Sequence, residues 1–262
     1  MTLWPDLRPW GDVGCPRWTP DTVSAVYRLD RLGVDELADV CAAVRSVAEG
    51  ASTITAAAGL VTSWLYEHLR DEDGRPAFAL LRLYKSHPFG ELPLAIRSFA
   101  TEHADQPLEL GTRCLTLLAS RGVEPAWDDP AKSLGHRAIP LLSAEMVARL
   151  PMVAGLLSQL GIDVAAVVRP NEDDAGRLHR QTYDVFYVPT AAGSPLVPAQ
   201  DGFVDRYGIE SVLGFGGMLM SGDVYAVIGF TTVAIPKRVA ELFRSVSMAV
   251  KTSLIPHTFA PL

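Results

Sequence analysis

The chain has 262 residues, of which 48% are hydrophobic and 20% charged, so it can bury a substantial core as one large domain or two modest ones. Its net charge of −7 and its few lysines argue against a general binder of nucleic-acid backbones, because such proteins cluster basic residues on one surface. Those lysines are Lys85, Lys132, Lys237 and Lys251. Nucleic acid is therefore not an expected partner.

Three further features predict a reduced, cytoplasmic protein without a membrane partner. The cysteines, Cys15, Cys41 and Cys114, are odd in number and far apart, so they suit neither a disulfide framework nor a metal-binding pair. Residues 1–14 contain acidic residues and prolines where a signal peptide has an apolar core. The longest apolar runs, such as residues 224–230, are far shorter than the ~20 residues of a membrane helix.

Residues 1–33 are expected to form an extended arm that precedes a single domain at residues 34–256. Prolines recur through the first part of this arm and exclude a regular helix, while tryptophans between them favour burial against the body. Residues 257–262 are expected to form a short tail.

The first elements expected after the arm are two helices. Residues 34–48 carry apolar residues at spacings of three and four, and Gly50 ends this pattern. A second helix is predicted over residues 52–69, and the sequence DEDG at 71–74 then makes a turn.

From Pro76 the pattern changes to that of a mostly buried strand, which ends in the sequence KSHPFGELP. A helix is predicted near residues 94–103. Residues 112–120 are predicted to form a strand, followed by a turn at Arg121 and Gly122.

The segment 143–160 is predicted to be helical, with Pro151 either starting a new helix or kinking the first one. Strands are predicted over residues 163–168 and 183–188, with an acidic surface loop between them. Residues 189–203 are too rich in proline and glycine for regular structure, and loops of that length are often lids or binding loops.

Two apolar runs at residues 211–219 and 224–230, separated by MSGD, predict a hairpin. An amphipathic helix is predicted over residues 236–254. Strands joined by tight turns pair antiparallel, so the expected fold class is α+β, with a central antiparallel sheet flanked by helices.

The glycines at positions 214, 216 and 217 raise the question of a nucleotide-binding loop. Such a loop needs a helix N-terminus directly after the glycines, because the helix amides hold the phosphate. Here another strand follows the turn SGD, and no Lys-Ser/Thr pair completes a Walker loop. We interpret the glycines as part of a strand that a neighbouring backbone or a ligand approaches closely, which makes Phe215 a candidate for ligand binding.

Polar tips on two of the predicted strands are further candidates for ligand binding. The first strand carries Arg82, Tyr84 and Lys85, of which Arg82 and Tyr84 share one face. Tyr183 and Tyr187 share one face of a later strand. Side chains in such stripes also occur in ordinary half-buried sheet, which is the alternative.

His136 and Arg137 complete the candidate set. They lie in LGHRAIPL, between a turn-rich segment and a helix, where side chains can point into a cavity. The histidines of the chain show no HExxH or other metal-ligand spacing, so no metal site is predicted. A haem needs only one axial histidine and stays open as an alternative, as does a purely structural role for His136.

Sequence motifs of nucleophilic catalysis are missing. The chain has no GxSxG elbow, no SxxK motif and no cysteine next to a histidine. We therefore expect a protein that is not an enzyme, although triads assemble in space and leave no obligatory sequence signal.

Several long stretches resemble the GAF-like sensory region of bacterial sensor histidine kinases and related signalling proteins, such as phosphatases and cyclases. They include FALLRLYKSHPFGELP, CLTLLASRGVEPAWDDPAKSLGHRAIPL, the sequence from YDVFYVPT to VYAVIGF, and the closing helix. The resemblance covers residues 35–256. It implies a central antiparallel sheet flanked by helices, with a small-molecule pocket on one side of the sheet.

The sequence departs from that family in two respects. In such proteins the closing helix normally continues into an output domain, whereas this sequence stops at Leu262. GAF domains that hold a bilin place a cysteine beside a histidine, and no such pair occurs here, so covalent bilin attachment is not expected.

Together these observations predict a cytoplasmic, non-catalytic sensor domain of bacterial signal transduction that binds a small molecule. The sequence names neither the ligand nor a cofactor. The helix at residues 236–254 is expected to form a homodimer interface or to contact a signalling partner protein. The alternatives are a small enzyme or a haem- or flavin-binding protein with a site around His136, and a purely structural interaction domain.

Overall fold

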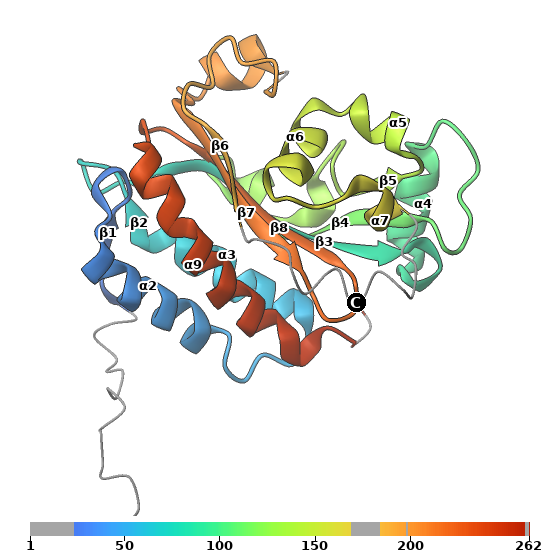
Figure 1. Ribbon diagram of the computed structural model, residues 1–262, viewed down its shortest axis with the longest axis horizontal. Helices are drawn as coiled ribbons and strands as arrows, with labels where there is room; N and C mark the ends of the chain where they lie inside the picture. The colour runs from blue at the N-terminus through green and yellow to red at the C-terminus, as the bar shows by residue number, and fades with distance from the viewer. Residues whose placement is uncertain (1–23, 169–183, 198, 260–261) are drawn as a thin grey trace, which may run out of the picture.

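The computed structural model describes residues 24–168, 184–197, 199–259 and 262, with helices on both sides of one central sheet (Figure 1). Most of the predicted N-terminal arm lies outside the described residues. The described part of the arm contains a short strand β1 (Tyr27–Arg28) and a 3-10 turn η1 (Leu29–Arg31). Leu29 and Leu32 are fully buried, so this part of the arm packs on the body.

The central sheet has six strands, all paired antiparallel, in the order β5-β4-β3-β8-β7-β6. In chain order these strands are β3 (Phe78–Pro88), β4 (Arg113–Gly122), β5 (Ala138–Leu141), β6 (Val185–Val188), β7 (Ser211–Met218) and β8 (Val224–Thr231). The fold class expected from the sequence, α+β with a central antiparallel sheet flanked by helices, is therefore confirmed.

Alternation along the strands sends side chains into two separate cores. On β3, Leu81 and Leu83 belong to one core, whereas Leu80 and Tyr84 belong to the other. Every residue of β7 and β8 is buried, because elements cover both faces of the sheet there.

Three long helices cover the first face of the sheet: α2 (Val34–Val47), α3 (Ile54–His68) and α9 (Lys237–Leu254) (Figure 1). Each was predicted from apolar residues at helical spacing, and that apolar stripe packs into the first core. The side chain of Thr53 caps α3 by accepting a hydrogen bond from the backbone N–H of Ala56 at 3.1 Å. All three predictions are confirmed to within two residues at each end.

Three shorter helices, α5 (Ala144–Ala148), α6 (Pro151–Gln159) and α7 (Val164–Val168), cover the second face (Figure 1). Pro151 is the first residue of α6, where its missing N–H has no helical partner to lose. The single helical segment predicted over 143–160 is thus divided at the proline, which was one of the two outcomes expected.

Residues 164–168 form a helix, so the strand predicted over 163–168 is wrong. A run of five apolar residues has no period that separates a buried strand from a buried helix. The side chain of Asp163 decides between them, because its Oδ1 accepts a hydrogen bond from the N–H of Ala165 at 2.9 Å and starts the helical turn.

The sheet also extends further than the sequence indicated. β4 continues through Arg121 and Gly122, which pair with Leu81 and Leu80, so the turn predicted there is wrong. β5 was not predicted because it contains Pro140, which cannot donate a ladder hydrogen bond. The proline is tolerated because β5 lies at the edge of the sheet, beside β4 only. The helix predicted near residues 94–103 is confirmed as α4 (Leu94–Glu102).

The predicted hairpin is confirmed by the pairing of β7 with β8. Its turn closes with a hydrogen bond from the N–H of Leu219 to the carbonyl of Asp223 at 2.8 Å. Gly222 has a φ of +79°, which side-chain-bearing residues rarely adopt. Gly216 pairs with Ala226 inside the sheet, and its carbonyl accepts a hydrogen bond from Ser247 of α9 at 2.9 Å.

We expect Gly216→Val to lower the free energy of unfolding by about 3 kcal/mol or more. A Cβ at this position would lie 2.3 Å from the carbonyl oxygen of Tyr225, a backbone atom that moves only if the pairing of β7 with β8 is disturbed. Urea denaturation measures the loss. Gly59→Ala in α3 is the matched control, because nothing lies within 4 Å of a Cβ there and alanine favours the helix by about 1 kcal/mol. Equal stability of the two variants would contradict this account of β7.

Candidate functional site

A cavity of about 310 Å³ lies on the second face of the sheet. We call it the apolar cavity, because most of the side chains around it are aliphatic or aromatic. The residues around it are Leu80, Arg82, Tyr84, Trp127, His136, Met152, Val197, Ala199, Phe203, Ile228 and Phe230. Its volume falls within the range of small-molecule pockets.

Aromatic rings form one wall of the apolar cavity. The ring centroid of Phe203 lies 5.8 Å from that of Trp127 and 4.9 Å from that of Phe230. The rings of Phe203 and Phe230 are arranged edge to face. Trp127 comes from the 3-10 turn η3 (Pro125–Asp128), and Phe203 from the π-helical turn η6 (Gln200–Asp205).

The long loop predicted at residues 189–203 contributes Val197, Ala199 and Phe203 to the apolar cavity. The side chain of Gln200 holds this loop together, accepting from the N–H of Gly193 at 2.8 Å and donating to the carbonyl of Ala191 at 3.2 Å. The described residues of this segment therefore form one wall of the cavity, and the last residues of the predicted loop form the start of η6.

Arg82 is the one cationic side chain around the apolar cavity, among the residues that the structure describes. Its Nε is buried and has no hydrogen-bond partner there, and no carboxylate of the described segments forms an ion pair with its guanidinium. Arg82 acts instead on its neighbour on the same strand face. Burial raises the pKa of the Tyr84 hydroxyl, and the charge and hydrogen bond of Arg82 partly oppose that rise.

His136 lies beside the apolar cavity on the segment that leads into β5. Desolvation by the surrounding protein and the positive charge of Arg82 lower the pKa of His136, so its imidazole is neutral at pH 7. The structure thus brings together three residues that the sequence singled out: Arg82, Tyr84 and His136.

The other candidates lie elsewhere. Arg137 does not line the cavity, and its carbonyl accepts the N–H of Leu117 at 2.9 Å. Phe215 is buried in the first core against Phe243 of α9, with 5.2 Å between the ring centroids. Tyr187 packs against the same core, and its hydroxyl donates to the carbonyl of Ile235, two residues before α9 begins.

Phe215 and Tyr187 therefore lie apart from Arg82. Both alternate onto the face of the sheet that α9 covers, opposite to the apolar cavity. Tyr183 lies outside the described residues.

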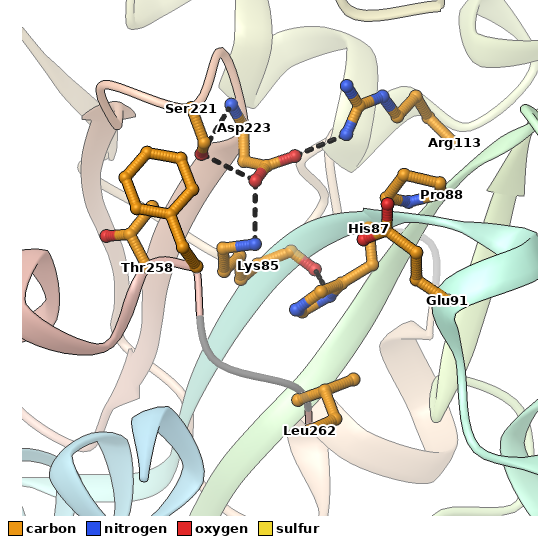
Figure 2. Close-up of a pocket in the computed structure, with 10 residues that line it drawn as sticks. Lys85, His87, Pro88, Glu91, Arg113, Ser221, Asp223, Thr258 and Leu262 are labelled. Atoms are coloured by element: carbon orange, nitrogen blue, oxygen red, sulfur yellow. Dashed lines mark hydrogen bonds and ion pairs between the residues drawn. The ribbon is translucent and has the colours of Figure 1, made fainter.

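A second cavity, of about 580 Å³, lies at the end of the sheet where β3, β4 and the β7–β8 turn meet the residues after α9 (Figure 2). We call it the charged cavity. At its wall, Nζ of Lys85 lies 2.7 Å from Oδ2 of Asp223, and the guanidinium of Arg113 donates to Oδ1 of the same carboxylate. Ser221 donates to Oδ2 at 2.6 Å. Lys85 is only 2% exposed, which is rare for lysine unless it is paired.

Sequence reasoning missed the charged cavity. The sequence predicts Lys85 and His87 at the end of a strand, with Lys85 among its polar tips, and Asp223 in a turn, but it does not bring these residues together. The available signal was a lysine inside a mostly buried strand, which requires a buried partner that the sequence does not locate.

His87 also lines the charged cavity and is held neutral there. Its Nδ1 lies 3.2 Å from the carbonyl of Lys85, and because a carbonyl only accepts, Nδ1 carries the ring hydrogen. Burial, followed by the charge of Lys85, lowers the pKa of His87 to about 4, against a smaller opposite effect of Asp223.

No protein-family model and no curated protein matches this sequence. Two solved structures match this chain at low structural similarity. The phycoerythrobilin-bound GAF domain from a cyanobacterial phytochrome has a TM-score of 0.42 and 12% identity, with 87% of this chain and 99% of that chain covered. The chromophore-binding domain of the bacteriophytochrome RpBphP3 from R. palustris has a TM-score of 0.39 and 9% identity, with 84% and 61% covered. These structures include a GAF domain, the class that the sequence resembles, and their names describe what those proteins bind rather than what this chain binds.

Across the described segments, no helix is long and apolar enough to cross a membrane. Within the same segments, no three His, Cys, Asp or Glu side chains gather as a metal ion would require.

We expect His87 to make the protein less stable as the pH falls from about 6.5 to about 4. The folded state holds the ring neutral down to a pKa of about 4, whereas the unfolded chain protonates it near pH 6.5, so acid favours unfolding. Between pH 7 and pH 4.5 this one group removes about 2 kcal/mol of stability. Denaturation of the wild type and of His87→Gln at both pH values isolates the effect, and an equal loss in the two proteins would contradict it.

Proposed function

We propose that this chain is a non-catalytic sensor domain that binds a small molecule in the apolar cavity. We further propose that the molecule has an apolar body and one acidic group. The observation that carries both proposals is Arg82, a cation in an otherwise apolar cavity whose Nε has no partner in the described part of the chain.

The charge of Arg82 favours an anionic ligand. A cation held against apolar side chains has lost part of its hydration, and a carboxylate or phosphate group on a ligand compensates for that loss with charge-assisted hydrogen bonds. The rings of Trp127, Phe203 and Phe230 supply flat apolar surface for the rest of the molecule.

The composition of the cavity supports binding rather than catalysis. The side chains that line it in the described segments include no serine, cysteine or carboxylate that His136 could activate. The raised pKa of Tyr84 keeps that hydroxyl protonated at neutral pH, where it serves as a hydrogen-bonding group.

A role in bacterial signal transduction in the cytoplasm, through a homodimer or a partner protein, is part of the same proposal. The apolar face of α9 packs inside the protomer, against α2 and the sheet. A dimer through this helix would therefore use its outer stripe, which consists of Ser245, Met248, Thr252 and Ile255.

The ligand proposal is tested with naphthalene-2-carboxylate and naphthalene-2-carboxamide, which have nearly the same shape and differ in charge. We expect the wild type to bind the carboxylate about tenfold more tightly than the amide, measured by calorimetry. Arg82→Met should weaken carboxylate binding about tenfold and leave amide binding within about threefold, because only the charged contact is lost.

Arg149→Met is the control, since Arg149 is exposed at the end of α5 and does not line the cavity. It should bind both compounds as the wild type does. Equal affinity of the wild type for the two compounds, or unchanged carboxylate binding in Arg82→Met, would contradict the proposal. Visible absorbance of the purified protein would favour the alternative of a haem or flavin beside His136.

The dimer is tested by light scattering. We expect the wild type to have the mass of two chains and Met248→Lys that of one, because a charge on the outer stripe of α9 would be desolvated in the interface. Thr55→Lys, on the exposed side of α3, is the control and should stay dimeric. A wild type that is monomeric at high concentration removes the dimer from the proposal and leaves the ligand part standing.

A further inference from the structure

The charged cavity takes no part in the function proposed above, because the proposed ligand binds in the apolar cavity. The residues that line it come from the sequence KSHP of β3, from the SGD turn of the β7–β8 hairpin and from the first residue of β4, among others (Figure 2). Lys85 and Asp223, which form its central contact, are 138 residues apart in the chain.

The buried charges of this cavity do not balance. Lys85 and Arg113 are two cations, and both are paired with the single carboxylate of Asp223. The side-chain exposures are 3% for Lys85, 14% for Arg113 and 7% for Asp223, so water screens these groups weakly. One positive charge is left over at the wall of the cavity.

Asp223 has little capacity left to take up that charge. Its two oxygens already accept from Lys85 and Arg113, and from the hydroxyl of Ser221 at 2.6 Å. The hydroxyl of Ser86 lies 3.4 Å from Oδ1 as well. A single carboxylate cannot neutralise two cations. The ammonium of Lys85 also donates to the carbonyl of Ser86 at 3.2 Å, which leaves it one donor, and the guanidinium of Arg113 retains further donors for another acceptor.

Glu91 is the other acidic residue around the cavity in the described segments. It is exposed at the rim and forms no ion pair with Lys85 or Arg113. Its charge is therefore solvated and leaves the buried surplus in place.

We propose that the charged cavity is a binding site for a small oxyanion, a phosphate or carboxylate group, held by Arg113 and Lys85. The guanidinium of Arg113 is less buried than Lys85 and offers a planar pair of donors, which matches two oxygens of such a group. The charged cavity, with a volume of about 580 Å³, is larger than inorganic phosphate would fill. Apolar surface is added by Pro88, Phe259 and Leu262. The anion is therefore the acidic group of a larger molecule.

Binding of the oxyanion couples to protonation of His87. The groups around this ring are Lys85 and Arg113, which oppose its protonation, Asp223, which favours it, and Glu91 at the rim. A bound anion offsets the positive charges of Lys85 and Arg113 and so favours the protonated form of His87. The ring then takes up a proton and becomes a third donor to the anion.

The direct test is a calorimetric titration of the full chain with inorganic phosphate at constant ionic strength, with chloride as the reference salt. We expect saturable binding of one phosphate per chain, and tighter binding of phenyl phosphate than of inorganic phosphate because its ring occupies the remaining volume. The absence of saturable binding by either compound would overturn the proposal and would identify the Lys85–Asp223–Arg113 cluster as purely structural.

Variants locate the site. Arg113→Gln should weaken phosphate binding about tenfold, whereas Arg113→Lys, which keeps the charge, should lose less. Arg238→Gln, an exposed position on α9 outside the cavity, is the matched control and should bind as the wild type does. Equal binding by Arg113→Gln and the wild type would place the anion elsewhere and overturn the assignment.

The proton coupling is tested with sulfate, which does not itself titrate between pH 5 and pH 7. We expect the affinity for sulfate to rise as the pH falls across this range in the wild type and to stay flat in His87→Gln. A parallel rise in both proteins would overturn the role given to His87. Arg82→Met should leave phosphate binding unchanged, so failure of this proposal and failure of the proposed function are distinguishable.

Discussion

The structure depends on β3 being covered on both sides. This strand lies in the middle of the sheet between β4 and β8, with α2, α3 and α9 over one face and α5, α6 and α7 over the other. A strand in that position sends the side chains of both faces into the interior, so each polar residue on it needs a specific partner or a cavity. β3 carries Arg82, Lys85 and His87, and the two cavities lie at these residues.

The two cavities treat a buried cation in opposite ways. Lys85 meets a carboxylate from the other end of the chain and forms a nearly dry ion pair with it. Arg82 lines the apolar cavity beside the hydroxyl of Tyr84, and its charge stays without a carboxylate in the described segments. An ion pair of the first kind holds the end of the β7–β8 hairpin to β3, whereas an unpaired cation of the second kind contributes little to holding the fold and is available to a ligand.

Local pattern was sufficient for the parts of the fold that repeat with a clear period. The helices α2, α3, α4 and α9 and the β7–β8 hairpin follow from spacing, caps and turn residues within each segment. The prediction for residues 163–168 was wrong because five apolar residues carry no period. The strand β5 was not predicted because Pro140 is tolerated only at an edge, which is a property of the sheet and not of the segment.

For the candidate sites, too, local pattern predicted some features, whereas others depend on which elements pack together. Parity along a strand correctly placed Arg82 beside Tyr84, and it also predicts that Tyr187 shares a face with Val185. Parity does not say which element covers that face, and α9 covers it in the case of Tyr187. The contact between Lys85 and Asp223 lies beyond any such rule, because nothing near either residue indicates the other. What the sequence does contain is the energetic demand: a lysine in a strand with both faces buried requires a counter-charge, and a turn aspartate that packs against the sheet end is a residue able to supply it.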